Sequence, residues 1–224
     1  MNILAIETSC GKASVAIYSG KTTLAFAQTL ENNTQAESLF ALIDKVFAQT
    51  NLGYNQIDYL ATTTGPGSFT GIRIGLSASK GIILAAKHIT PCTFSNFEVM
   101  AFRALKQTAN IETIIVALEC SATTIYIQSF NCQLHALNDP QILNISELSL
   151  YLNSYSGTLA ITGSGINITK DIILDKPSII LLPRYPEIDA KLVISLAAYK
   201  FRLKKPFNQD LAPLYIKQPS TRIN

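Results

Sequence analysis

A glycine-rich stretch, Thr62–Gly81, reads TTTGPGSFTGIRIGLSASKG and is the first place to look for phosphate chemistry. A Walker loop has Lys and then Ser or Thr after its last glycine, whereas Gly71 is followed by Ile72. The dinucleotide fingerprint GxGxxG also fails, because the glycines here give GxGxxxG with a proline inside. Backbone amides at a helix N-terminus can still bind an anion. The candidate anion or nucleotide loop consists of Gly65, Gly67 and Ser68.

Side chains for nucleophilic or metal chemistry are sparse. Ser68 could be a peptidase nucleophile, but GPGSFTG lacks the GxSxG elbow, and a base would have to be His88 or His135. The histidines stand apart, no HExxH or HxxxH occurs, and the cysteines form no CxxC. Glu7 closes the first predicted strand, where a lone carboxylate makes a poor Mg²⁺ site. We expect no catalytic residue and no metal site, and a hydrogen-bonding role for Glu7.

The same glycines can instead serve helix packing. Gly71, Gly75 and Ser79 recur every four residues, with Ala78 beside them, in a helix predicted over 69–86. Such a stripe lets another backbone approach closely and gain dispersion contacts. The spacing leaves two partners open: an element of the same chain, or a helix of a second molecule.

Apolar periodicity predicts the elements that must position these residues. The first half reads β-β-β-α-β-α, and the second half repeats this order. The predicted segments of the first half are 2–6, 14–18, 22–29, 34–49, 59–63 and 69–86. Those of the second half are 113–118, 123–129, 133–137, 146–152, 158–162 and 187–203.

A faint sequence echo supports a duplicated unit. AIETS at 5–9 is similar to ALECS at 117–121, and TGPG at 64–67 is similar to TGSG at 162–165. Two such units give the architecture of actin, sugar kinases and Hsp70-type ATPases. We expect an N-terminal lobe over 1–94, a linking helix over 95–110 and a C-terminal lobe over 111–224, whose last helix can pack back on the first lobe.

Composition restricts the class of protein further. Of the 224 residues, 48% are hydrophobic and 15% charged, which excludes a polar disordered chain. No apolar run reaches the roughly 18 residues of a membrane span, and the N-terminus lacks a signal-peptide pattern, so a cytosolic location is expected. From Lys200 onward the sequence has six basic residues and one acidic residue. This tail can contact phosphates, or its cations can compensate the dipole at the C-terminal end of a helix.

Three strings together resemble the TsaB (YeaZ) family, bacterial proteins of tRNA threonylcarbamoyladenosine biosynthesis. They are NILAIETSCGKASVAIY from Asn2, the glycine-rich stretch with its GPGSFTG core, and PLYIK near the C-terminus. The resemblance implies an α/β fold of the actin-like, RNase H-like ASKHA class. It also implies a non-catalytic scaffold that pairs with the transferase TsaD, which forms threonylcarbamoyladenosine at position 37 of tRNAs reading ANN codons.

The resemblance further implies the partners and the surface. TsaE, an ATPase, joins TsaD, so ATP or ADP and Mg²⁺ belong to the complex and not to this chain, and tRNA is met indirectly or weakly. Pairing uses the helices at 34–49 and 69–86, and the same surface can self-associate. The interface expected from this is Gly71, Arg73, Gly75, Ala78, Ser79, Leu39, Leu42 and Ile43.

The sequence departs from the family pattern at three places. Gln35 stands where many relatives have a histidine, and Ser121 stands where they have an arginine. Lys217 replaces the arginine of a C-terminal Tyr-Leu-Arg, which turns a bidentate contact into a point charge. Two other functions stay open beside the scaffold: an independent ATP-dependent kinase or ATPase of the same fold, and the peptidase above.

Overall fold

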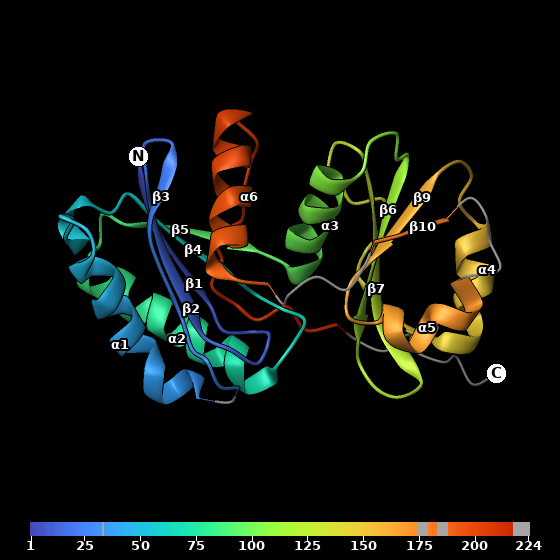
Figure 1. Cartoon of the computed structure of the whole chain (residues 1–224), viewed down its shortest axis with the longest axis horizontal. Helices are drawn as coiled ribbons and strands as arrows, with labels where there is room; N and C mark the ends of the chain where they lie inside the picture. The colour runs from blue at the N-terminus through green and yellow to red at the C-terminus, as the bar shows by residue number, and fades with distance from the viewer. Residues whose placement is uncertain (33, 174–178, 183–187, 217–224) are drawn as a thin grey trace. The chain divides into compact units, whose positions relative to one another are not determined.

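The computed structural model describes residues 1–32, 34–173, 179–182 and 188–216. The chain forms two compact units. The first consists of Met1–Val99 with Glu187–Leu214, and the second of Met100–Pro186 with Tyr215–Asn224. Figure 1 shows that each unit is built around its own β-sheet. None of the described helices is long and apolar enough to cross a lipid bilayer.

The first unit contains a five-stranded sheet of order β3-β2-β1-β4-β5. Strand β1 runs antiparallel to β2 and parallel to β4. Its strands are β1 (Asn2–Glu7), β2 (Ser14–Ser19), β3 (Thr22–Gln28), β4 (Tyr59–Thr63) and β5 (Thr90–Phe94). Its helices are α1 (Gln35–Ala48), the 3₁₀ turn Tyr54–Gln56, α2 (Phe69–Ala85) and α6 (Ala190–Arg202). Helix α3 (Asn96–Gln107) contains the division between the units.

Helices cover both faces of this sheet because alternate strand residues are buried on each side. Leu4 and Ile6 point to the face that packs against α1 and α2. Ile3 and Ala5 alternate with them and are also fully buried. Helix α6 packs against β1, β2 and β4 and lies on the other side of the sheet from α1 and α2 (Figure 1).

The second unit repeats the pattern, with sheet order β10-β9-β6-β7-β8. Its first strand is again antiparallel to the second and parallel to the fourth. The strands are β6 (Thr113–Glu119), β7 (Thr124–Asn131), β8 (Gln141–Asn144), β9 (Leu159–Thr162) and β10 (Ile179–Leu181). The helices are the 3₁₀ turn Ile145–Glu147, α4 (Leu148–Asn153) and α5 (Ile166–Ile173).

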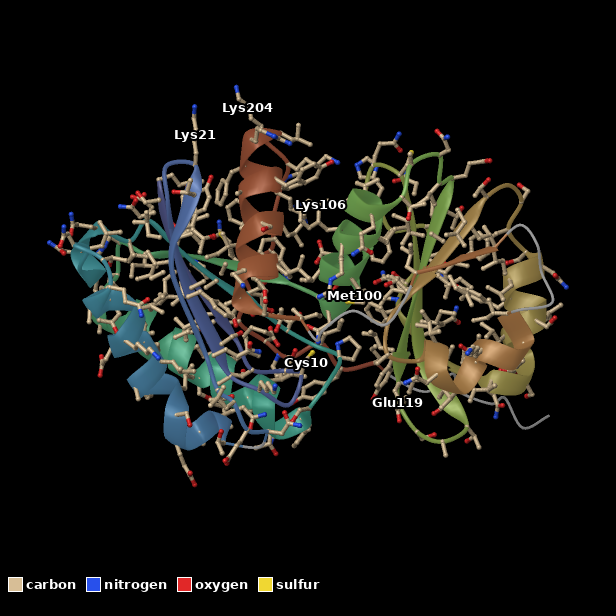
Figure 2. The ribbon with its side chains drawn as sticks, viewed as in Figure 1. Cys10, Lys21, Met100, Lys106, Glu119 and Lys204 are labelled. Atoms are coloured by element: carbon tan, nitrogen blue, oxygen red, sulfur yellow. The ribbon has the colours of Figure 1, made fainter. Side chains whose placement is uncertain are left out.

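The sequence echo falls on equivalent positions of the two units. Glu7 ends β1 and Glu119 ends β6, each the central strand of its sheet; Glu119 is labelled in Figure 2. Thr64–Gly67 follows β4, and Thr162–Gly165 follows β9. The predicted fold class, a duplicated actin-like α/β unit, is confirmed.

Two predictions for the second unit hold only in part. The third strand is β8, whereas 133–137 pairs with β7 through a single antiparallel bridge between Ala136 and Phe130, with Asn131 N donating to the His135 carbonyl and Leu137 N to the Ser129 carbonyl. Leu134 has a positive φ of 61°, which is incompatible with a strand. The helix predicted over 187–203 is present as α6, but the helix that directly follows β9 is α5.

The predicted boundaries of the lobes also need correction. Helix α6 begins at Ala190, after the N-cap Asp189, whose side chain accepts a hydrogen bond from the Leu192 N–H. It packs on the first sheet, as expected for the last helix, so residues 188–214 belong to the first unit. Glu187, Lys217 and Arg222 lie outside the described residues.

Candidate functional site

Helix α2 begins where β4 ends, at the loop that contains Gly65 and Gly67. Gly65 has a positive φ of 98°, a conformation that glycine adopts without strain. Ser68 is the N-cap, and its Oγ accepts a hydrogen bond from Gly71 N at 3.2 Å. Ser68 N donates to the Ser9 carbonyl at 2.8 Å. The hydroxyl of Ser68 therefore caps α2, and its amide ties the start of α2 to the residues that follow β1.

The glycine stripe of α2 faces its own sheet. A Cβ at Gly71 would overlap the carbonyl oxygen of Thr8, and a Cβ at Gly75 would overlap Thr8 Oγ1. Thr8 Oγ1 donates to the Gly71 carbonyl at 2.7 Å. Ser79 is fully buried and donates to the Gly75 carbonyl at 2.7 Å. The stripe lets α2 approach the end of β1, so its prediction as a seam between two molecules is wrong.

The three predicted interface residues of α1 are also internal. Leu39, Leu42 and Ile43 are buried in the core between α1, α2 and the sheet. They form the apolar face of α1, and that face is the one that the sheet covers. The residues available to a partner must therefore lie on the outer faces of α1 and α2.

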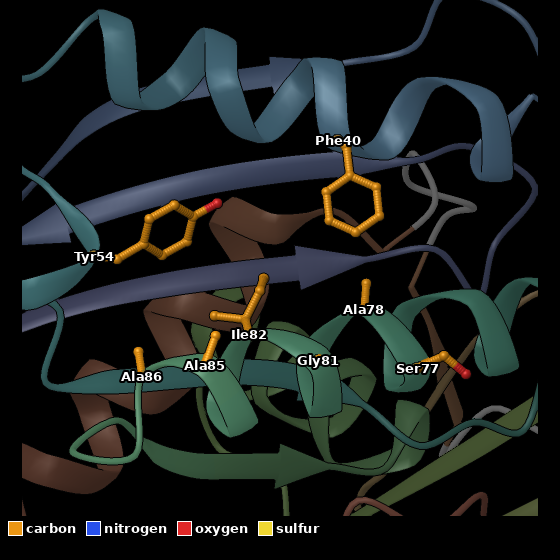
Figure 3. Close-up of a pocket in the computed structure, with 8 residues that line it drawn as sticks. All are labelled: Phe40, Tyr54, Ser77, Ala78, Gly81, Ile82, Ala85 and Ala86. Atoms are coloured by element: carbon orange, nitrogen blue, oxygen red, sulfur yellow. The ribbon is translucent and has the colours of Figure 1, made fainter.

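An apolar groove runs along those outer faces (Figure 3). Its volume is about 380 Å³. Phe40 of α1 points toward α2 across it, and 58% of Phe40 is exposed; Tyr54 of the 3₁₀ turn packs on Phe47 of α1, with 4.4 Å between ring centres. The residues that line the groove are Phe40, Tyr54, Ser77, Ala78, Gly81, Ile82, Ala85 and Ala86.

The groove depends on a second stripe of small residues in α2. Ser77, Gly81 and Ala85 are spaced by four, and all three are exposed. A Cβ built on Gly81 would meet nothing within 4 Å. Of the predicted interface residues, Ala78 lines this groove and Arg73 is exposed beside it, with its guanidinium 3.8 Å from the centre of the Phe69 ring. The spacing of this stripe was readable in the sequence, but it did not indicate which stripe faces outward.

A buried polar cluster lies behind the loop, at the carboxyl ends of β1 and β4. The Glu7 carboxylate accepts hydrogen bonds from Ser9 N, Ser9 Oγ and Thr63 Oγ1. Asn96 Nδ2 donates to Ser9 Oγ and to the Pro66 carbonyl, both at 2.8 Å. These bonds tie β1, β4, the loop and the start of α3 together. The expectation that Glu7 has a hydrogen-bonding role is confirmed.

The environment of Glu7 favours its protonated form. Burial raises its pKa to about 7, against the lowering effect of the hydrogen bonds from Ser9 and Thr63, and the charge of Asp189 adds to the rise. Both carboxylate oxygens already accept bonds from the protein, and no group of three or more His, Cys, Asp or Glu occurs among the described residues. The cluster does not fit a Mg²⁺ site.

The structure also bears on the peptidase reading and on the departures from the family pattern. Ser68 follows the carboxyl end of β4, whereas His88 precedes the parallel strand β5 and lies at the opposite edge of the sheet. Gln35 is buried at the start of α1. Ser121 Oγ bonds to the Thr124 hydroxyl at 2.8 Å within its own loop.

Comparison with known proteins assigns the family. Residues 30–179 match the family model of TsaD, tRNA N6-adenosine threonylcarbamoyltransferase. The tRNA threonylcarbamoyladenosine biosynthesis protein TsaB of Haemophilus influenzae is 32% identical over 127 residues, which cover 56% of this chain and 52% of that protein. TsaB of Buchnera aphidicola subsp. Baizongia pistaciae is 25% identical over 221 residues, with 96% and 98% covered.

Solved structures agree on the fold. A Pseudomonas aeruginosa protein described as similar to peptidase YEAZ superposes with a TM-score of 0.79 at 18% identity, covering 96% of this chain and 99% of that one. The chain spans about half the length of the Haemophilus influenzae relative that it matches and nearly all of the Buchnera one. Its full-length match, its family model and its duplicated fold together show that the chain belongs to the TsaB (YeaZ) branch of the TsaD family.

Proposed function

We propose that this chain is a non-catalytic subunit in the formation of threonylcarbamoyladenosine at position 37 of tRNAs that read ANN codons. It pairs in the cytoplasm with a TsaD-type transferase, which carries out the chemistry, and a TsaE-type ATPase joins them. The observation that carries this proposal is the exposed groove between α1 and α2. ATP or ADP and Mg²⁺ act at the level of the complex; on this chain the Glu7 carboxyl at the end of β1 is buried, and both of its oxygens already accept hydrogen bonds.

Homology between the two subunits supports pairing through this groove. TsaD of Fervidobacterium nodosum is 30% identical to this chain over 128 residues, which cover 47% of this chain and 37% of that one. Homologous chains that share a helix pair can associate about a pseudo-two-fold axis, with each pair packed on the other. The same geometry explains why the groove can also pair two copies of this chain.

The test places an arginine in the groove. Ala85 is exposed at the end of α2, where a cation suits the helix dipole, so Ala85→Arg should leave the fold intact. A long charged side chain in an apolar seam should weaken association with the TsaD-type subunit by at least about tenfold, or roughly 1.4 kcal/mol. Ala122→Arg, at an exposed position of the second unit, is the matched control.

The measurement is sedimentation or calorimetric titration of this chain with its TsaD-type subunit, followed by a modification assay on tRNA that omits each component in turn. Ala85→Arg should lose pairing and modification together, while Ala122→Arg keeps both. Equal pairing by the two variants would remove the groove from the interface. Modification of tRNA by this chain alone would contradict a non-catalytic role.

A further inference from the structure

Positive side chains gather at one edge of the first sheet, opposite the Glu7 cluster. The backbone register defines this edge: Gly20 N donates to the Met1 carbonyl at 3.2 Å, Asp58 N to the Asn2 carbonyl at 3.0 Å, and Thr90 N to the Asp58 carbonyl at 3.0 Å. The start of β1, the β2–β3 turn and the starts of β4 and β5 therefore lie side by side.

The end of α6 joins the same edge. The Phe201 ring packs on Tyr59, the first residue of β4, with 4.4 Å between ring centres, and Phe207 packs on both rings. The chain turns back after α6 at Lys204, which has a positive φ of 52°. In Figure 2, Lys21 of the β2–β3 turn and Lys204 extend from the same end of the first unit.

The charges at this edge are strongly unbalanced. Asp58 is the one acidic residue among these described strand starts and turns, and its Oδ2 lies 3.8 Å from the Met1 amino group. Lys200 is already paired with Glu98 at 2.6 Å. The other cationic side chains of the edge are Lys21, Lys87, Arg202, Lys204 and Lys205.

Two of these cations lie near an aromatic ring. The Arg202 guanidinium and the Lys205 ammonium each lie 5.9 Å from the centre of the Tyr199 ring. Helix-dipole compensation acts within the last turn of α6 and gives no reason for cations at Lys21 and Lys87, which come from other elements. A row of cations from three elements that converge on one edge is the electrostatic pattern of a surface that binds a phosphate backbone.

We propose that this basic edge, defined as Lys21, Lys87, Arg202, Lys204 and Lys205, contacts the phosphate backbone of RNA. The identification of that RNA as tRNA rests on the proposed function; the contact itself rests on the charges of the edge. Phosphate contacts of this kind position a nucleic acid without reading its sequence. The chain thereby adds affinity for tRNA that is separate from the groove between α1 and α2.

The salt dependence of binding tests the proposal. The full chain is titrated into unmodified tRNA that carries a fluorophore, at several concentrations between about 50 and 200 mM salt. The triple variant Lys21→Gln, Arg202→Gln and Lys204→Gln changes three exposed side chains. Each lost phosphate contact should reduce the slope of log K against log salt by about 0.7 to 0.9, so the variant should lose about 2 to 3 in slope.

A control with the same change in net charge makes the result specific. Lys12→Gln, Lys80→Gln and Lys170→Gln remove three cations away from the basic edge and should leave the slope unchanged. Equal slopes for the two triple variants, or no tRNA binding by the unaltered chain, would overturn the proposal. Tighter binding to phosphatidylglycerol vesicles than to tRNA, lost in the edge variant, would overturn it in favour of a lipid surface.

The modification assay separates this inference from the proposed function. Suppose that the salt slope depends on the basic edge but that tRNA is modified normally without this chain. The RNA contact of the basic edge would then be upheld and the proposed function contradicted. If the edge variant supports normal modification and its salt slope for tRNA binding is unchanged, the proposed function is upheld and the RNA contact of the basic edge is overturned.

Discussion

Glu7 shows how burial can override the ordinary chemistry of a carboxyl group. Three hydrogen bonds from Ser9 and Thr63 favour the charged form, yet the loss of hydration outweighs them and raises the pKa to about 7. A carboxyl group that is protonated near neutrality can hold a polar junction together without a counter-ion. Glu7 therefore joins β1, β4 and the loop before α2 at little electrostatic cost only while it is protonated, below its raised pKa of about 7.

The pKa of Glu7 predicts a pH dependence of stability. The ordinary value is 4.5, so between pH 4.5 and 7 the folded state binds more protons than the unfolded state. The free energy of unfolding must then fall as pH rises through this window and become level above pH 7. The contribution is complete below pH 4.5 and is lost above pH 7.

Glu7→Gln removes the titration while keeping the shape of the side chain. Relative to the unaltered chain, the variant should gain stability from pH 5 to pH 8, by at most about 3 kcal/mol. Denaturant unfolding at several pH values measures the difference. A constant difference between the two proteins across this range would show that Glu7 does not titrate as inferred.

Helix α2 carries two stripes of small residues with opposite roles. Gly71, Gly75 and Ser79 let the helix approach Thr8 at the end of β1, while Ser77, Gly81 and Ala85 form the floor of the exposed groove. Each stripe has a spacing of four, and the second is offset from the first by two residues, or roughly half a turn, so the stripes lie on different faces of the helix. Replacing a glycine therefore has opposite consequences on the two faces of α2. An added Cβ overlaps Thr8 on the inner face and meets open space at Gly81 on the outer face.

Paired glycine substitutions test this difference. Gly81→Ala should raise stability by about 0.5 to 1 kcal/mol, because alanine is the better helix former and its methyl group meets open space. Gly71→Ala should lower stability by about 1 to 3 kcal/mol, because the methyl group overlaps the Thr8 carbonyl. Thermal unfolding measures both, and a rise for both variants would contradict the assignment of the inner face.

Helix α6 connects distant parts of the sequence at the scale of the whole molecule. It comes from the end of the chain but covers the first sheet, where the Ala190 N–H donates to Ser14 Oγ at 2.9 Å and Lys200 pairs with Glu98 at 2.6 Å. Val193, Leu196 and Ala197 are fully buried there. The first unit is therefore complete only when the C-terminal segment is present.

Truncation tests this dependence. A chain that ends at residue 186 lacks α6, exposes one face of the first sheet to water and should lose the cooperative unfolding of the first unit. A chain that ends at residue 216 keeps α6 and should unfold as the full chain does. Limited proteolysis checks the result: cleavage within 1–99 should be rapid only in the shorter chain. Equal resistance in both would show that the first unit folds without α6.

The sequence by itself determined the repeat of strands and helices, the family and most boundaries of the first unit. Strand β4 and helix α2 begin where the apolar periodicity and the Ser68 cap predict, because those signals act within a few residues along the chain. The strand predicted over 133–137 is reduced to a single bridge at Ala136, because the Asn131 side chain accepts the N–H groups of Gln133 and His135.

Only the tertiary structure decided which face of α2 is covered, to which unit α6 belongs, and which cations meet at one edge. Spacing along a helix shows that residues share a face, but not what lies against that face. The Thr8 carbonyl that excludes side chains from Gly71 is 63 positions away in sequence, and Tyr59 is brought to Phe201 from a different element. Such contacts depend on how the strands are ordered in the sheet, which local periodicity does not encode.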